Sequence, residues 1–242
     1  MFVGLILLGM LVGETPDPDA ETVAGTAEQT ADITATETSP PTPPDDTPTA
    51  ATTPMSESTP EPTPEPTPAF STPIEFSGVG DDVISFDIPD EAPGGVHFTH
   101  SGTSNFAVTG YSQGGERTEL FVNTIGSYDG IRPINFTAET TAEFEIAADG
   151  AWAVSIFPLT AVRLAEASTE GTGDDLRNIA ALDVRTALIT HAGTSNFAVL
   201  AWGSGRSLLI NEIGSYSGRV RIPPETLVLE VVADGGWTID FE

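Results

Sequence analysis

An internal repeat constrains this chain more than any other feature of its sequence. Three blocks recur in the same order: residues 100–108 (HSGTSNFAV) match 191–199 (HAGTSNFAV), 123–130 (NTIGSYDG) match 211–218 (NEIGSYSG), and 148–152 (ADGAW) match 233–237 (ADGGW). The offsets are 91, 88 and 85 residues, so the second copy is three residues shorter between consecutive blocks. This pattern predicts two tandem copies of one structural module.

Within each copy, apolar and polar residues alternate with a period of two, which predicts short β-strands. Seven such runs occur in the first copy: residues 83–88, 96–99, 106–108, 120–122, 131–136, 144–146 and 152–156. No connection between them is long enough for a crossover helix, so the strands should be antiparallel. We therefore predict an all-β fold with two antiparallel β-sandwich modules, jelly-roll or Ig-like, at residues 74–164 and 165–242.

Two segments inside the modules have more specific expectations. Asp-Gly at 149–150 and 234–235 predicts a tight hairpin with positive φ, followed by a core tryptophan. Residues 164–181 could form a short helix, but alignment with the first copy favours a strand around 176–184, and we adopt the strand.

The first 73 residues have a different composition from the rest. Residues 1–13 begin with an apolar run (MFVGLILLGMLV) of the length of a signal-peptide core, which predicts a signal or membrane-anchor segment. Up to residue 73 the chain holds 14 of its 20 prolines, 12 of its 36 acidic residues and no basic residue. Such a segment cannot bury enough apolar surface to fold, so residues 14–73 are predicted to be a disordered Thr/Pro/Glu-rich stalk.

Charge and cysteine content exclude several functional classes. The net charge is -28, with eight arginines and no lysine, which disfavours binding to nucleic acid or to anionic membrane surfaces. Membrane contact is therefore expected only through the N-terminal segment. The absence of cysteine removes thiol catalysis, thiolate metal sites and a lipid-modified cysteine. No phosphate-binding glycine loop or zinc signature is present, so no cofactor is predicted.

Candidate binding residues come from the repeated blocks. Aromatic side chains in turns can bind carbohydrate, although a tyrosine in a turn also commonly packs over a sheet end. The candidates occupy equivalent positions in the two copies: Tyr128 and Tyr216, Asn123 and Asn211, and His100 and His191.

Catalytic and metal-binding alternatives have weaker support. His100 and His191 each precede a serine by four residues, so a Ser/His/Asp site is formally possible, but no Gly-x-Ser-x-Gly motif accompanies either serine. The Asp pairs at 81–82 and 174–175 supply oxygen ligands for calcium but lack the spacing of a calcium loop, which favours solvated turns.

The H-x-G-T-S-N-F-A-V, N-x-I-G-S-Y-x-G and A-D-G-x-W blocks resemble small β-sandwich repeats of exported proteins from high-GC bacteria. In size and strand number the modules are also similar to the pre-peptidase C-terminal type of secreted domain. This resemblance implies a surface or secreted accessory module without a known catalytic residue. We expect a non-enzymatic, extracellular or surface-tethered protein that binds a cell-envelope glycan or another surface protein. A pair of carbohydrate-binding modules is the first alternative and a secreted hydrolase the second.

Overall fold

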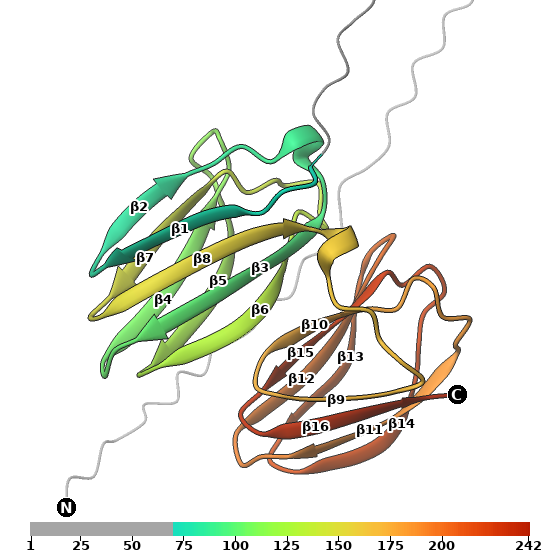
Figure 1. The fold of residues 1–242 in the computed structure, drawn as a ribbon. Helices are drawn as coiled ribbons and strands as arrows, with labels where there is room; N and C mark the ends of the chain where they lie inside the picture. Colours follow the sequence, from blue (N-terminus) through green and yellow to red (C-terminus); the bar gives the residue numbers. More distant parts are fainter. Residues whose placement is uncertain (1–69) are drawn as a thin grey trace, which may run out of the picture. The chain divides into compact units, whose positions relative to one another are not determined.

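The structure is a computed structural model that describes residues Phe70–Glu242. The predicted signal segment and nearly all of the predicted stalk lie outside these residues. The described part is almost entirely β-structure and forms two modules of eight strands each (Figure 1). We refer to residues 74–158 as module 1 and to residues 168–242 as module 2. Within the described residues, no helix has the length and apolar character needed to cross a membrane.

Module 1 consists of two four-stranded antiparallel sheets. Its strands are β1 (Ile74–Val79), β2 (Asp82–Ser85), β3 (Gly94–Ser101), β4 (Asn105–Tyr111), β5 (Arg117–Ile125), β6 (Tyr128–Ile134), β7 (Glu143–Ala148) and β8 (Ala151–Pro158). One sheet has the order β1-β8-β3-β6 and the other β2-β7-β4-β5. Short 3-10 turns, η1 (Pro89–Glu91) and η2 (Leu159–Ala161), follow β2 and β8.

Module 2 has the same strand order. Its strands are β9 (Ser168–Thr172), β10 (Asp175–Asn178), β11 (Thr186–Ala192), β12 (Asn196–Trp202), β13 (Arg206–Ile213), β14 (Tyr216–Arg221), β15 (Val228–Ala233) and β16 (Gly236–Phe241). They form the sheets β9-β16-β11-β14 and β10-β15-β12-β13. Eight strands divided between two sheets in this order, with only the fourth and fifth consecutive in one sheet, form a jelly roll. The prediction of two antiparallel sandwich modules is confirmed, in its jelly-roll form.

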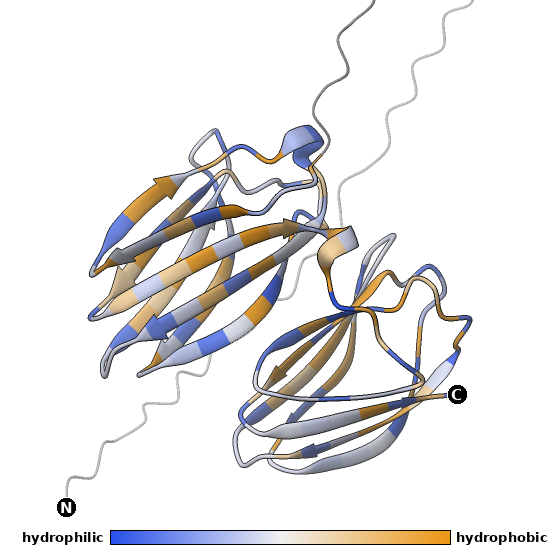
Figure 2. Cartoon of the chain, in the orientation of Figure 1, coloured by the Kyte–Doolittle hydropathy of each residue, from blue (hydrophilic) through white to orange (hydrophobic). Residues whose placement is uncertain are grey.

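The cores of both modules come from the alternation in the sequence. In β8 and β11, buried residues alternate with partly exposed ones along the strand. Figure 2 shows that hydrophobic residues are distributed over the strands of both modules. Because strand side chains point to opposite faces in turn, one face of each sheet is apolar and packs on the other sheet. Fully buried aromatic rings fill the centre of each sandwich: Phe98, Phe106 and Phe144 in module 1, and Phe197 and Trp237 in module 2.

The prediction of seven strands per module omits the first one. Burial alternates along β1, but Gly78 occupies one of the inward-facing positions, where a strand usually has an apolar side chain. A glycine at such a position weakens the prediction of a strand. A Cβ atom at Gly78 would collide with the ring of Trp152, which packs beneath β1 and donates from Nε1 to the Gly80 carbonyl at 2.9 Å. The glycine is therefore required by packing within the sandwich. Gly171 and Trp237 repeat this contact in module 2.

The predicted Asp-Gly hairpins are wrong. Asp149 and Gly150 connect β7 to β8, but these strands belong to different sheets, so the turn crosses from one sheet to the other. Neither residue has a positive φ. The glycine is needed because a Cβ atom at position 150 would collide with the Ser101 carbonyl oxygen.

The connection between the modules also differs from its prediction. The alternative of a helix within residues 164–181 is wrong, because β9 and β10 occupy this segment. The adopted strand at 176–184 is correct only at its beginning, since β10 ends at Asn178. Leu164 forms an isolated bridge with Asn178, and Ala165 is buried in the core of module 2.

Candidate functional site

His100 lies beneath the turn between β5 and β6, and its side chain has no exposed surface. Its Nδ1 atom donates to the Gly126 carbonyl oxygen at 2.7 Å; a carbonyl can only accept, so Nδ1 carries the proton. The ring stacks on Phe106 with 4.4 Å between centroids and 7° between planes. On its other side, Nε2 faces Oδ1 of Asp149 at 3.4 Å. One imidazole thus connects a turn, the core and the crossing between the two sheets.

Asp149 accepts the hydrogen bonds that shape the turn before β4. Its Oδ2 atom accepts from the backbone nitrogens of Thr103 and Ser104, both at 3.0 Å, and from the Thr103 hydroxyl at 3.2 Å. The pKa of Asp149 lies below its usual value, chiefly because of the hydrogen bond from the Thr103 backbone N–H. The hydrogen bonds from the Ser104 backbone and the Thr103 hydroxyl add to this effect, and burial opposes it. The carboxylate therefore stays ionised and keeps the turn ordered.

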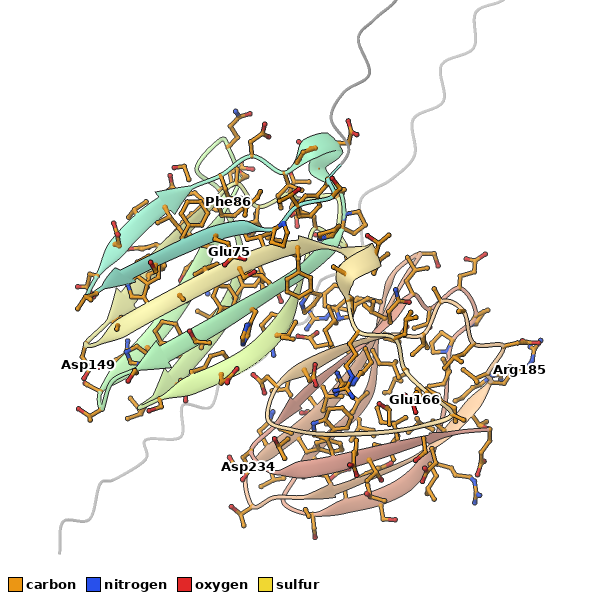
Figure 3. The ribbon with its side chains drawn as sticks, viewed as in Figure 1. Glu75, Phe86, Asp149, Glu166, Arg185 and Asp234 are labelled. Atoms are coloured by element: carbon orange, nitrogen blue, oxygen red, sulfur yellow. The ribbon has the colours of Figure 1, made fainter. Side chains whose placement is uncertain are left out.

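Module 2 makes the same arrangement at the equivalent positions. His191 donates from Nδ1 to the Gly214 carbonyl at 2.8 Å, and its Nε2 lies 3.3 Å from Oδ1 of Asp234. The ring stacks on Phe197 at 4.2 Å and 5°. Asp234 accepts from the backbone of Thr194 at 2.9 Å, and this bond foremost lowers the pKa of Asp234. Figure 3 shows Asp149 and Asp234 at the ends of their respective sandwiches.

The geometry of these pairs does not assemble a serine nucleophile. Ser104 bonds through its backbone: its nitrogen donates to Asp149, and its carbonyl accepts from Gly126 at 2.7 Å. Between Phe70 and Glu242, no hydrogen bond joins the hydroxyl of Ser104 to His100. The imidazole is buried, and its hydrogen bonds connect the turns on either side of it.

The acidic turns considered for calcium have backbone partners. Asp81 accepts from the Ala148 nitrogen at 2.9 Å, and Asp174 accepts from the Ala233 nitrogen at 3.0 Å. In both modules, this bond connects the turn that precedes the second strand to the end of the seventh. Over the described part of the chain, no three histidine, aspartate or glutamate side chains gather in a way that could hold a metal ion.

The two candidate tyrosines lie beside the histidines but have different surroundings. Tyr128 is the register partner of His100, and Tyr216 is that of His191. The Tyr128 hydroxyl donates to Oδ2 of Asp174 at 2.8 Å. Burial, followed by the Asp174 charge, raises the pKa of Tyr128. Tyr128 therefore connects the two modules, whereas Tyr216 is half-buried over the core of its own module.

The two candidate asparagines lie apart from the histidines, in the other sheet. Asn123 in β5 and Asn211 in β13 are both exposed. An exposed isoleucine lies two residues after each asparagine: Ile125 is 73% exposed and Ile213 is 82% exposed. A binding role for these asparagines, as for the tyrosines and histidines, stays a prediction.

A buried charge cluster, which was not among the residues predicted from the sequence, joins the modules. Arg132 in β6 lies with Nη2 2.9 Å from Oε1 of Glu230 and with Nη1 3.5 Å from Oδ2 of Asp174. Glu230 in β15 is 1% exposed, and its other oxygen accepts from Nε1 of Trp202 at 2.8 Å. Burial lowers the pKa of Arg132, but Glu230 and Asp174 outweigh it, so the pKa is raised and the guanidinium stays charged.

Apolar side chains surround this cluster, and we call the whole contact the junction. Six buried residues form its centre: Val162, Leu176, Ala198, Leu200, Trp202 and Val228. Module 1 contributes partly buried residues that include Ile131, Phe136 and Phe157. Phe136 and Trp202 have ring centroids 6.0 Å apart. The outer face of β10-β15-β12-β13 is thus covered by module 1.

One sequence signal could have revealed the junction. Residues 196–202 (NFAVLAW) are apolar on both faces, whereas the equivalent 105–111 (NFAVTGY) alternate. A strand of an antiparallel sandwich that is apolar on both faces must be covered on both sides. The sequence also contains a signal for the buried acid, because Glu230 is the one charged residue in an otherwise apolar strand (VLEVVA).

Comparison with known proteins adds no family. No family model matches the chain, and no curated protein was found to match it.

Proposed function

We propose that this chain is a non-enzymatic exported or surface-tethered protein whose Pro-rich stalk presents two duplicated jelly-roll modules for binding a ligand or partner. The duplication is inferred from three repeated sequence blocks, equal strand orders and equal contacts of His100 and His191. The bacterial accessory modules that the blocks resemble are the basis for placing the protein outside the cell.

The observation that carries this proposal is the junction. Two modules connected only by a flexible linker would present two independent surfaces. Here Arg132 and Glu230 form a buried ion pair between them, and losing one partner of such a pair is strongly unfavourable. The pair therefore favours a single fixed head made of both modules, and a stalk beneath it keeps that head away from the membrane.

Surface labelling in the native organism tests the location. Antibodies raised against the purified chain should label intact cells, and protease added outside should remove the head. Label that appears only after the cells are lysed would contradict the proposal. A second assay, the retention of the full chain on isolated cell-envelope fractions, tests binding separately from location.

A further inference from the structure

A pocket of about 240 Å³ opens in module 2, beside the residues that precede β11 and those that follow β14. Its apolar walls include Ile179, Leu182 and Pro223. Arg185, which lines it, lies at the opposite end of the module from Asp234 (Figure 3). The pocket therefore lies away from the histidine turn of module 2.

Backbone hydrogen bonds tie the two pocket-forming segments together. The Ile222 nitrogen donates to the Arg185 carbonyl at 2.9 Å, and the Ile179 nitrogen donates to the Leu227 carbonyl at 2.8 Å. Inside the first segment, the Leu182 nitrogen donates to the Ile179 carbonyl at 2.9 Å. The walls are thus formed before any ligand arrives, which reduces the entropy lost on binding.

Two arginines line this pocket, Arg185 and Arg221. Neither forms a salt bridge with any residue from Phe70 to Glu242. Arg117, Arg163 and Arg206 also lack a salt bridge among the described residues, so what distinguishes Arg185 and Arg221 is that both line the same small pocket. The neighbouring Arg219 shows the contrast, because it forms a two-pronged pair with Glu242.

Module 1 shows that the fold does not require these arginines. The register pair Thr186–Arg221 in module 2 corresponds to the pair Gly95–Pro133 in module 1. Gly94 stands at the position of Arg185. Since module 1 builds the same strand pairing without either charge, the arginines are available for a role other than folding.

The other polar groups of the pocket restrict the class of ligand. Asp183 and Glu225 also line it, and their carboxylates accept hydrogen bonds but repel anions. A sulfate ion would bring no donor to them, and neither a sulfate nor a phosphate ion would cover the apolar walls. A sugar acid supplies a carboxylate for the arginine forks, hydroxyl donors for the two carboxylates and C–H faces for the apolar walls. The pocket is smaller than most ligand sites, which span roughly 300–1,000 Å³, so it would accept a single ring.

We propose that this pocket binds one uronic-acid residue of an acidic polysaccharide, with Arg185 and Arg221 holding the sugar carboxylate. The inference rests on the proposed function, for which it names a ligand class and a site. It departs from the sequence-based candidates, because none of those six residues lines the pocket.

Calorimetric titration of the full chain with trigalacturonate tests the proposal, with neutral galactotriose as the matched probe. Trigalacturonate should bind at least about tenfold more tightly than galactotriose. Arg221→Gln and Arg185→Gln should each weaken it about tenfold, the loss expected for one charge-assisted contact. Arg219→Gln is the control: it lies on the same strand outside the pocket and should leave affinity unchanged. Thermal unfolding checks that every variant is folded.

Several results would overturn the site. Trigalacturonate could fail to bind, bind no better than galactotriose, or lose as much affinity in Arg219→Gln as in Arg221→Gln. A peptide with the sequence of residues 59–68 (TPEPTPEPTP) that bound as tightly through the same arginines would show that any flexible carboxylate suffices. Cell-surface labelling is independent of these titrations, so failure of the pocket and failure of the proposed function can be distinguished.

Discussion

The outer faces of two equivalent sheets differ. In module 2, Leu200 and Val228 on β10-β15-β12-β13 are buried against module 1. In module 1, the equivalent positions on β2-β7-β4-β5 hold Thr109 and Glu143, both part-exposed. The same fold thus accommodates either kind of face, and the face that is covered is the apolar one.

An equivalent hydrogen bond to a glutamate is found on the outer face of each module, and only the one in module 2 is part of the junction. In module 1, the Tyr111 hydroxyl donates to Oε2 of Glu145 at 2.8 Å on the exposed face. In module 2, Trp202 donates to Glu230 over the same distance, but there Arg132 of module 1 neutralises the buried acid. A solvated pair in one module corresponds to an interface element in the other.

The largest expected effect comes from removing the junction cation. Arg132→Met should reduce the free energy of unfolding by about 3–5 kcal/mol, because Glu230 would remain buried without its partner. Urea unfolding at neutral pH measures this. Arg219→Met, which breaks an exposed pair, should change little. Equal losses in the two variants would show that the junction charges are solvated.

Truncating an apolar side chain of the junction should cause the next largest loss of stability. Leu200→Ala should cost about 2–4 kcal/mol, the usual range for a buried leucine, while Thr109→Ala at the equivalent position should cost less than about 0.5 kcal/mol. The same unfolding assay applies. A Thr109→Ala cost as large as that of Leu200→Ala would mean that the face of module 1 is also covered.

A smaller difference should separate the two repeated tyrosines. Tyr128→Phe removes a hydrogen bond to Asp174 across the junction and should cost about 1 kcal/mol. No hydrogen bond of the Tyr216 hydroxyl is found between Phe70 and Glu242, so Tyr216→Phe should be close to neutral. Thermal unfolding of the two variants side by side would reveal the asymmetry, and a reversed order would contradict the assigned contact.

The smallest difference between the modules is expected at the histidine turns. The pKa values of Asp149 and Asp234 are lowered in the folded protein. Each carboxylate therefore stabilises the fold at pH values above 3.8, the usual pKa of an aspartate. This contribution is lost as the pH falls through the lowered folded-state pKa. Asp149→Asn and Asp234→Asn should therefore destabilise the protein to a similar extent at pH 7 and lose that effect in acid. Unequal losses at pH 7 would show that the two turns are not equivalent.

The sequence pattern predicted the fold class. It did not predict the features that arise from contacts between residues far apart in the sequence. Alternation and the repeated blocks were sufficient for two antiparallel sandwiches, because both are local signals. The sheet crossing at Asp149 was missed, since Asp-Gly resembles a hairpin turn and the need for Gly150 arises from Ser101, far away in sequence. Arg132 and Arg221 were also missed, because a lone arginine in a strand does not reveal whether it faces a buried acid or a pocket.

Backbone ¹⁵N relaxation of the full chain in solution shows whether the two modules tumble as one rigid head. If the junction holds, amides of β4 and β12 should report the same rotational correlation time, that of one body containing both modules. Two shorter and unequal correlation times, one for each module, would show that the modules move independently.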